Sequence, residues 1–253
     1  MLRACLESLD EQGLPMHVRV VNAGSPLDLP RFNFLEFEVI QAPESAFWTE
    51  CMAIGTRDLP TPYALLSNAD TVFLPGCVEA LLSASSEKII ACSPAYFTNG
   101  MTEYTDQAQW GALLFGKILR RWPHRSEASA EPLQIELTGG QGVLVPATAF
   151  KDASWAIQDL PQYASDHDFW LQLRRKGWRL VLAPKAGISN ARPFGLGSKG
   201  IFHRLTSLYA AESAVTMWRL RRRNLPLPLA VMSWIVSFGL RWTLGLPGIL
   251  RRR

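Results

Sequence analysis

The sequence predicts an α/β protein with a three-layer α/β/α domain around a mostly parallel central sheet. Segments with apolar residues at helical spacing alternate with short apolar segments of strand length along most of the chain. The strand-like segments lack a polar and apolar alternation, which is typical of strands that helices cover on both faces. With 253 residues, of which 48% are hydrophobic and 19% charged, the chain is long enough to bury such a core.

The first half of the chain carries most of this alternation. Leu2, Cys5 and Leu6 begin a helical repeat, and the turn-forming residues from Gly13 to Pro15 end it. The run of Tyr63, Ala64, Leu65 and Leu66 has the pattern of a strand buried in a sheet. The expected elements are helices at 2–9, 47–54 and 77–82 and strands at 18–21, 37–40, 63–67 and 89–93.

The second half becomes regular from Leu137 onward. A glycine-rich turn at 138–142 leads into an apolar strand at 143–145 and a short helix that reaches Phe150. A basic amphipathic helix then runs from 165 to Gly177, and a strand at 180–183 follows it. The order of strand and helix in turn favours a layered α/β fold.

The charge divides the chain into a body and a tail. Residues 1–203 contain 17 Lys and Arg against 21 Asp and Glu, a net charge of −4. Residues 204–253 contain nine Arg against Glu212 alone, a net charge of +8. A weakly acidic body with a basic, apolar tail indicates that the tail binds an anionic surface. We therefore predict a body domain at 1–203 and a helical, membrane-associating tail at 204–253.

The tail is apolar, but its sequence does not predict a transmembrane helix. Its uninterrupted apolar core, Leu229–Leu240, has only 12 residues, fewer than a transmembrane helix needs. Arginine triplets flank it at 221–223 and 251–253, as expected for an amphipathic helix that lies in the plane of an anionic membrane. The alternative is a C-terminal helix that packs on the body or contacts a partner.

The cysteines and the first residues bear on the compartment. Cys5, Cys51, Cys77 and Cys92 form no CxxC pair and lie in apolar stretches, so we expect reduced core thiols in a cytosolic chain. The first dozen residues contain four charged side chains and no apolar run. A secretory signal peptide is therefore not expected.

Two polar residues follow the predicted strand at 63–67. Asn68 and Asp70 would lie at the carboxyl end of that strand, where open α/β sheets bind their ligands. A carboxylate there suits a divalent cation that holds a diphosphate. The same Asn-x-Asp pattern also starts turns through hydrogen bonds from side chain to backbone. The pattern by itself leaves both interpretations open.

Two carboxylates begin the helix at 165. Asp166 or Asp168 would accept a proton from a substrate hydroxyl if it lay within hydrogen-bond reach. Alternatively, Ser165 or Asp166 caps the helix, and the acidic residues complement the helix dipole. The spacing of the two aspartates is compatible with both roles.

Five segments, taken in their order and spacing, resemble the family 2 inverting glycosyltransferases of the GT-A fold, in a rhamnosyltransferase-like form. They look like the family's first helix, second strand with its turn, DXD-like metal-binding segment, glycine turn and base-bearing helix. The matching segments are Leu2–Leu9, Val20–Ser25, Leu65–Thr71 with Pro75 and Gly76, Gly139–Val145 and Ser165–Trp178. The resemblance covers most of residues 1 to 190 and implies a GT-A-type domain.

Carried over by position, the resemblance implies a site. Asp70 would coordinate the metal on the donor diphosphate, Asn68 would lie beside the nucleotide, and Asp166 would be the general base. The resemblance also places Asn22 and Gly140 in the donor site and Asn190 at the metal.

These roles imply an inverting, metal-dependent hexosyltransferase. It would move a sugar from a nucleotide-sugar to a hydroxyl of a sugar or lipid-linked acceptor, with Mg²⁺ or Mn²⁺, to build a cell-surface polysaccharide or a glycolipid. The protein is expected to be cytoplasmic and peripheral at the inner face of the cell membrane. No nucleic-acid partner is expected, because the positive charge is confined to the tail. Trp170 and Trp178 are predicted to pack in the core, with stacking on an acceptor sugar as the alternative.

The chain departs from the family pattern in several places. The strand that precedes the family's first helix is missing, so the domain is expected to be N-terminally truncated. Asn22 replaces an Asp that contacts the nucleobase, Ser165 replaces the Glu of the base motif, and Asn190 replaces a His of the metal site. The alternative function is thus a degenerate, non-catalytic homologue that acts as a membrane-associated binding or scaffold protein. A nucleotidyltransferase is not favoured, because no glycine-rich, basic triphosphate loop occurs near the start.

Overall fold

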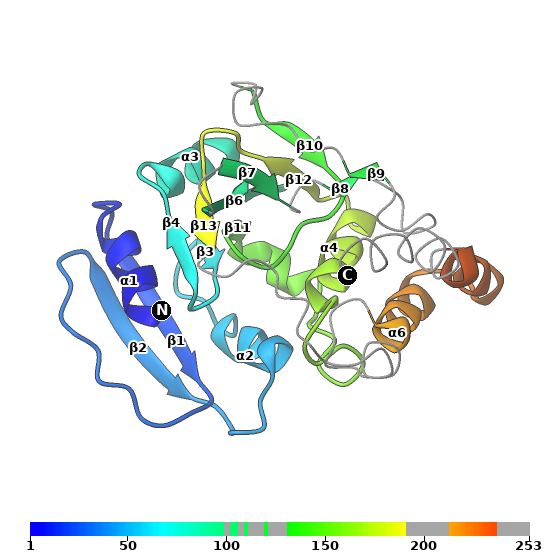
Figure 1. The fold of residues 1–253 in the computed structure, drawn as a ribbon, viewed down its shortest axis with the longest axis horizontal. Coiled ribbons are helices and arrows are strands. Elements are labelled where there is room, and N and C mark those ends of the chain that lie inside the picture. The colour runs from blue at the N-terminus through cyan, green and yellow to red at the C-terminus, as the bar shows by residue number, and fades with distance from the viewer. Residues whose placement is uncertain (99–101, 106–108, 111–118, 121–130, 191–212, 237–253) are drawn as a thin grey trace, which may run out of the picture.

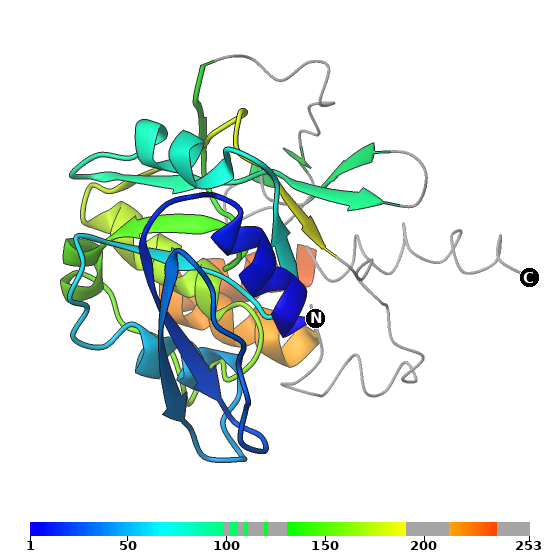
Figure 2. The ribbon, with the colours of Figure 1, turned by 90° about the vertical axis from the view of Figure 1, so that its left-hand side faces the viewer.

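The computed structural model describes residues 1–98, 102–105, 109–110, 119–120, 131–190 and 213–236 (Figure 1). They form a mixed α/β domain in which helices lie against a central sheet, so the predicted α/β class is confirmed. Figure 2 shows the same chain from its side, with α1 beside the β1–β2 pair.

The N-terminal part forms a unit of two helices and a small sheet. Strands β1 and β2 pair in parallel over their whole length, with Met16 opposite Leu35 and Asn22 opposite Gln41. Helix α2 contacts β1, and α1 contacts β4 of the larger part of the domain. The elements are α1 (Leu2–Asp10), β1 (Met16–Asn22), β2 (Leu35–Gln41) and α2 (Trp48–Gly55).

A five-stranded sheet with the order β10-β12-β5-β11-β3 forms the centre of the domain. Only β12 and β5 pair in parallel, whereas the other three pairs are antiparallel. The expectation of a mostly parallel sheet is therefore corrected for this sheet. An apolar run predicts a strand but not its direction relative to a neighbour that lies far along the chain, as Val143–Pro146 does from Tyr63–Leu66. The strands are β3 (Tyr63–Leu66), β5 (Ile89–Cys92), β10 (Leu133–Ile135), β11 (Val143–Pro146) and β12 (Arg179–Leu182).

A second sheet with the order β4-β13-β6-β7 lies next to the candidate residues. Its strands are β4 (Thr71–Phe73), β6 (Ala95–Thr98), β7 (Thr102–Thr105) and β13 (Ile188–Asn190), and a further small pair consists of β8 (Gln109–Trp110) and β9 (Leu119–Arg120). These strands were not predicted, because each has only two to four residues and includes a polar one, so none stands out in the sequence as an apolar run. In this sheet Asn190 pairs with Thr71, the residue that follows Asp70.

The hydrophobic core lies where the five-stranded sheet meets α3 (Cys77–Ala84), the 3₁₀ helix η3 (Ala147–Lys151) and α4 (Ser165–Arg175). Trp170 and Trp178 are buried there, which confirms their predicted packing role. All four cysteines are free thiols. Burial raises the pKa of Cys92 to about 12, so this thiol stays protonated and is not a nucleophile.

Two helices follow at the C-terminal side. Helix α6 (Ala214–Asn224) packs on α4, and the Ser213 side chain caps it by accepting a hydrogen bond from the Thr216 N–H. A helix at 227–236 follows, and the Trp234 indole donates to the Ala214 carbonyl. Among the described helices, none is both long and apolar enough to cross a membrane. The arginine triplet at 251–253 lies outside the described residues.

Candidate functional site

The candidate residues meet where three separate segments end or begin. The segment after β3 carries Asn68 and Asp70, the turn before β11 carries Gly140, and the first turn of α4 carries Asp166. Trp48, the first residue of α2, joins these segments, because its indole N–H donates to the Asn68 Oδ1 at 2.7 Å. The fold thus brings together three of the residues that the sequence nominated, Asn68, Gly140 and Asp166, and Asp70 lies two positions after Asn68.

Trp48 is held by close packing as well as by its hydrogen bond. A Cβ atom placed on Gly140 would lie 2.4 Å from the Trp48 ring and 3.5 Å from the Asp166 Cβ. On another side the Trp155 ring meets Trp48 edge to face, with the ring centroids 5.6 Å apart. Gly140 is therefore required as glycine, because its missing side chain leaves the space that the indole fills next to Asp166.

Both polar atoms of the Asn68 side chain make hydrogen bonds to residues around the site. Its Oδ1 accepts from Trp48, and its Nδ2 donates to the Gln141 Oε1 at 3.2 Å. The Asn68 carbonyl also accepts from the Thr71 N–H, so a backbone hydrogen bond closes the turn, and the Asn68 side chain does not make the side-chain to backbone bonds of the alternative interpretation. Asn68 thus positions the loop of Asp70, and any contact of Asn68 with a nucleotide stays a prediction.

Asp70 differs from Asn68 because its carboxylate makes no hydrogen bond or ion pair within the described residues. The side chain is half-buried and lines a cavity. It lies close to Cys5: burial is the main reason why the pKa of Cys5 is raised, and the negative charge of Asp70 adds to the effect. A half-buried carboxylate without a partner is costly unless a cation or a donor group satisfies it.

These residues fit a divalent cation that is bound largely by its substrate. Among the described residues, no cluster of three or more His, Cys, Asp or Glu side chains could enclose a metal. Mg²⁺ commonly binds through one or two carboxylates together with substrate phosphates and water, and Asp70 offers one such carboxylate. Asn190 lies on the strand next to it, beside Thr71.

Asp166, in the first turn of α4, is the carboxylate there that keeps an oxygen without a partner among the described residues. It is half-buried, and its Oδ1 accepts from the His167 N–H at 2.8 Å, which fixes the side chain. The residue before α4, Ala164, has a φ of 65° and provides no side-chain cap. Asp166 thus satisfies one amide of the helix start, as the alternative interpretation expects, and its second oxygen makes no hydrogen bond or ion pair within the described residues. A non-glycine residue in the left-handed region is strained and often marks a functional segment.

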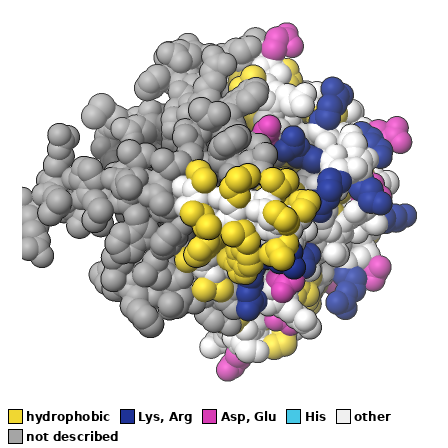
Figure 3. Space-filling model, turned by 90° about the vertical axis from the view of Figure 1, so that its right-hand side faces the viewer, with side chains coloured by type: hydrophobic (Ala, Val, Ile, Leu, Met, Phe, Trp, Pro, Cys, Tyr) yellow, Lys and Arg dark blue, Asp and Glu magenta, His cyan; other side chains and the backbone are white. Residues whose placement is uncertain are grey.

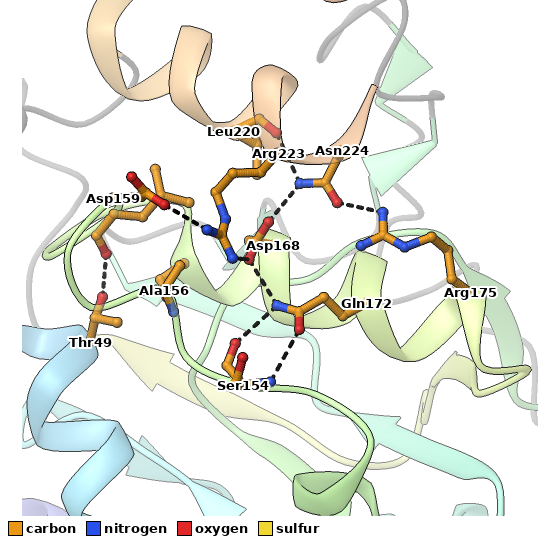
Figure 4. A network of polar contacts seen from close by, with 12 residues as sticks. Thr49, Ser154, Ala156, Asp159, Asp168, Gln172, Arg175, Leu220, Arg223 and Asn224 are labelled. Carbon is orange, nitrogen blue, oxygen red and sulfur yellow. Dashed lines mark hydrogen bonds and ion pairs between the residues drawn. The ribbon is translucent and has the colours of Figure 1, made fainter. Parts of the chain in front are cut away.

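Asp168 has a structural role (Figure 4). It is buried, and its two oxygens accept from Asn224 at 2.6 Å, from Gln172 at 2.8 Å and from Arg223 at 3.1 Å. Burial by itself would lower the pKa of Arg223, but the charges of Asp168 and Asp159 raise it overall, so the guanidinium stays charged. Asp168 therefore ties α6 to α4 and cannot also act on a substrate.

Asn22 forms the turn after β1. Its Nδ2 donates to the Ser25 carbonyl at 2.7 Å and to the Gln41 side chain at 3.2 Å, and its Oδ1 accepts from the Gly24 N–H at 3.1 Å. The side chain thus shapes the carboxyl end of β1. Its contact with a nucleobase stays a prediction.

Trp48 and Gln141 were missed by the sequence-based reasoning. Trp48 appears in the sequence only as part of an apolar helix, and Gln141 as one residue of a glycine-rich turn. The hydrogen bond from Trp48 to Asn68 joins residues 20 positions apart, and the one from Asn68 to Gln141 joins residues 73 positions apart. No local pattern signals such contacts.

The fold is similar to solved structures of two glycosyltransferases. S. aureus TarS 1-349 in complex with UDP-GlcNAc aligns with a TM-score of 0.56 and 11% identity, over 96% of this chain and 69% of that chain. GalNAc-T7 with UDP, GalNAc and Mn²⁺ aligns with a TM-score of 0.54 and 14% identity, over 74% of this chain and 37% of that chain. The chain thus matches little more than a third of the GalNAc-T7 structure. Neither the protein-family models nor the curated proteins give a match.

At these identities the likeness establishes the fold, which is that of the GT-A glycosyltransferases. The candidate residues lie at the carboxyl end of β3 and at the adjoining turn and helix start. Ligands of open α/β sheets bind at such an edge.

Proposed function

We propose that this chain is a glycosyltransferase that moves a sugar from a nucleotide-sugar donor to a hydroxyl acceptor with inversion at the anomeric carbon. The observation that carries the proposal is the pair Asp70 and Asp166. Each has a carboxylate oxygen without a partner among the described residues. Trp48 links the two segments, because it donates to Asn68 and packs on Gly140 next to Asp166. The GT-A fold and its UDP-sugar-binding neighbours support the same activity.

Asp166 is proposed as the general base. One of its oxygens is held by the His167 N–H, so the other is left to accept the proton of the acceptor hydroxyl. The acceptor oxygen then forms its bond to the anomeric carbon while the bond from that carbon to the donor diphosphate breaks. A single displacement of this kind inverts the configuration.

Asp70 is proposed to hold Mg²⁺ or Mn²⁺ on the donor diphosphate, with Asn190 beside it. The bound cation would neutralise charge on the leaving diphosphate. Asn22 and Asn68 shape the two strand ends next to the nucleotide, and Gly140 keeps Trp48 in place. Gly140 and Asn68 therefore serve the site by positioning other groups.

The tail is proposed to place the enzyme on an anionic membrane, at the cytoplasmic face where a lipid-linked acceptor would lie. Figure 3 shows a patch of hydrophobic side chains bordered by Lys and Arg side chains. The helix at 227–236 exposes six large apolar side chains, each between 38% and 56% exposed: Leu227, Leu229, Val231, Met232, Ile235 and Val236. An apolar face with flanking arginines is the pattern of a helix that lies in a membrane interface. The acceptor would then belong to polysaccharide or glycolipid assembly.

Calorimetric titration of UDP, with and without Mn²⁺, tests the donor site. We expect metal-dependent binding to the parent protein and a loss of about tenfold or more in affinity for Asp70→Asn. Asp28→Asn is the matched control, because Asp28 is exposed and makes no hydrogen bond or ion pair within the part of the chain that the structure describes. Binding that is unchanged in Asp70→Asn would show that Asp70 does not hold the metal.

Hydrolysis or transfer of the donor sugar tests the base. Asp166→Asn is expected to bind UDP like the parent and to lose turnover by about 10² or more. If the parent protein binds no nucleotide and Asp166→Asn changes nothing, the alternative of a non-catalytic binding or scaffold protein is favoured instead.

A further inference from the structure

The loop that leads to the proposed base, residues 156–164, is held from two sides. Toward α6, the Arg223 guanidinium donates to the Asp159 carboxylate at 2.6 Å. Toward α2, the Thr49 hydroxyl donates to the carbonyl of Leu160 at 2.6 Å, and the Leu160 side chain is fully buried. Figure 4 shows Thr49 and Arg223 on either side of this loop. The loop backbone is therefore fixed before any substrate binds.

The contacts between this loop and the start of α2 follow one register. The Thr49 N–H donates to the Pro161 carbonyl at 3.1 Å, and the Trp48 N–H donates to the side chain of the next loop residue at 3.2 Å. Each step backward along α2 is thus matched by one step forward along the loop. The next positions in this register are Phe47 and Tyr163. The fold therefore brings these two aromatic residues to neighbouring positions.

Both aromatic side chains are exposed, although they stand on a fixed framework. Phe47 is 39% exposed and Tyr163 is 37% exposed, whereas the nearby Phe169 and Trp170 are fully buried. The Tyr163 hydroxyl makes no hydrogen bond within the part of the chain that the structure describes. Neighbouring exposed aromatic side chains on a fixed loop are typical of a binding surface.

The aromatic pair lies beside the proposed base. Tyr163 stands three positions before Asp166, in the segment that leads into α4. On the α2 side, Trp48 follows Phe47, and its indole fills the space at Gly140. The same space adjoins the Asp166 Cβ, at 3.5 Å from a Cβ placed on Gly140. A molecule that brings a hydroxyl to the second oxygen of Asp166 therefore meets Phe47 and Tyr163.

We propose that Phe47 and Tyr163 form an acceptor subsite, and that a pyranose ring carries the acceptor hydroxyl. A pyranose has faces of C–H bonds, which pack on aromatic rings, and hydroxyl groups around its edge. The ring stacks on the aromatic pair and turns one edge hydroxyl toward Asp166. This inference rests on the proposed function, because the stacked sugar is an acceptor only if Asp166 is the base.

Saturation-transfer difference NMR on the full chain, with and without UDP and Mn²⁺, tests the subsite. The probes are the methyl glycosides of glucose, galactose, mannose and N-acetylglucosamine, each at about 10 mM, a concentration suited to weak binding. Sorbitol is the control, because it has the hydroxyl groups of a sugar without the ring. Transfer to the C–H protons of at least one glycoside is expected. Transfer to none of the four, or equal transfer to sorbitol, would overturn the proposal.

Point variants locate the binding. Tyr163→Ser and Phe47→Ser are each expected to weaken binding of the glycoside by about fivefold or more. Tyr163→Phe keeps the ring and is expected to bind like the parent. Phe34→Ser is the matched control, because Phe34 is 43% exposed and lies beside Met16, at the other end of β1 from the site. The Tm of each variant is measured in parallel and is expected to change little. Equal glycoside binding by Tyr163→Ser and Phe34→Ser would contradict the assignment.

Calorimetric titration of UDP with Mn²⁺ separates this inference from the transferase activity itself. Tyr163→Ser is expected to bind UDP like the parent, because Asp70 is assigned to the metal and the diphosphate. If the parent does not bind UDP, the proposed function fails. If the parent binds UDP but its glycoside binding does not depend on the aromatic pair, only the acceptor subsite fails. Weaker UDP binding by Tyr163→Ser, or weaker sedimentation of this variant with anionic vesicles, would assign the pair to the donor or to the membrane and overturn the proposal.

Discussion

Gly140→Ala is expected to destabilise the protein through a single contact. The new Cβ would lie 2.4 Å and 2.5 Å from two atoms of the Trp48 six-membered ring. This is about 1 Å shorter than a normal carbon–carbon contact, so the indole has to move. Overpacking of this kind costs about 1–3 kcal/mol, and loss of the Trp48–Asn68 hydrogen bond costs about 1 kcal/mol. We expect the free energy of unfolding to fall by about 3 kcal/mol.

The neighbouring glycine supplies the control. A Cβ on Gly139 meets nothing within 4 Å, and neither glycine has a positive φ. Gly139→Ala reports the entropic effect of the substitution on the unfolded chain, so it is expected to be neutral or stabilising by up to about 1 kcal/mol. Urea unfolding, followed by tryptophan fluorescence, gives both values. Equal stabilities of the two variants would refute the reasoning.

A double-mutant cycle with Trp48→Phe identifies the contact itself. The smaller ring leaves room for the Cβ at position 140, so the double variant is expected to lose at least about 1 kcal/mol less than the sum of the single variants. Strict additivity would mean that Gly140 matters for a reason other than its contact with Trp48.

Three further predictions concern the rest of the molecule. Arg223→Ala is expected to lower the free energy of unfolding by about 2 kcal/mol, because it leaves a buried carboxylate without its cation, whereas the exposed Arg222→Ala is expected to change it by less than about 0.5 kcal/mol. Urea unfolding compares the two, and equal effects would contradict the role of the ion pair. The free energy of unfolding is expected to fall as pH rises from the ordinary thiol pKa of 9.0 toward 12, because the folded protein keeps Cys92 protonated while the unfolded chain ionises it. The fall of this free energy with pH is expected to be less steep for Cys92→Ala. An equally steep fall in the variant would contradict the role of Cys92. Met232→Glu with Ile235→Glu is expected to weaken sedimentation with anionic vesicles by about tenfold, and undiminished binding would exclude this face as the membrane contact.

The ion pair between α4 and α6 links the proposed base to the tail. Asp168 and Asp166 belong to the same helical turn, and Asp168 receives Arg223 and Asn224 from α6. The exposed apolar helix at 227–236 follows α6 after a short turn. A surface that binds this helix would therefore hold α4, and with it Asp166, in a defined orientation.

Much of the fold could be predicted from local patterns. The helices at α1, α2, α3 and α4 and the strands at β1, β3, β5, β11 and β12 lie within a few residues of their expected positions. The helices have periods long enough to recognise, most of the predicted strands are short apolar runs, and glycine or proline marks several of the ends. The strands β4, β6, β7, β10 and β13 were not predicted, because each has only three or four residues and includes a polar one, so it does not stand out as an apolar run. Pairing direction was also wrong for much of the central sheet.

The sequence by itself determined where candidate carboxylates stand along the chain: Asp70 after a buried strand, and Asp166 and Asp168 at a helix start. Only the tertiary structure decided between them. Arg223 and Asn224, 55 and 56 residues further along the chain, bind Asp168, whereas Asp166 keeps one oxygen and Asp70 both oxygens without a partner among the described residues. The packing of Trp48 on Gly140 was likewise decided only by the tertiary structure. Helical and strand periods follow from neighbouring residues, whereas burial and hydrogen-bond partners depend on segments that meet only after the chain has folded.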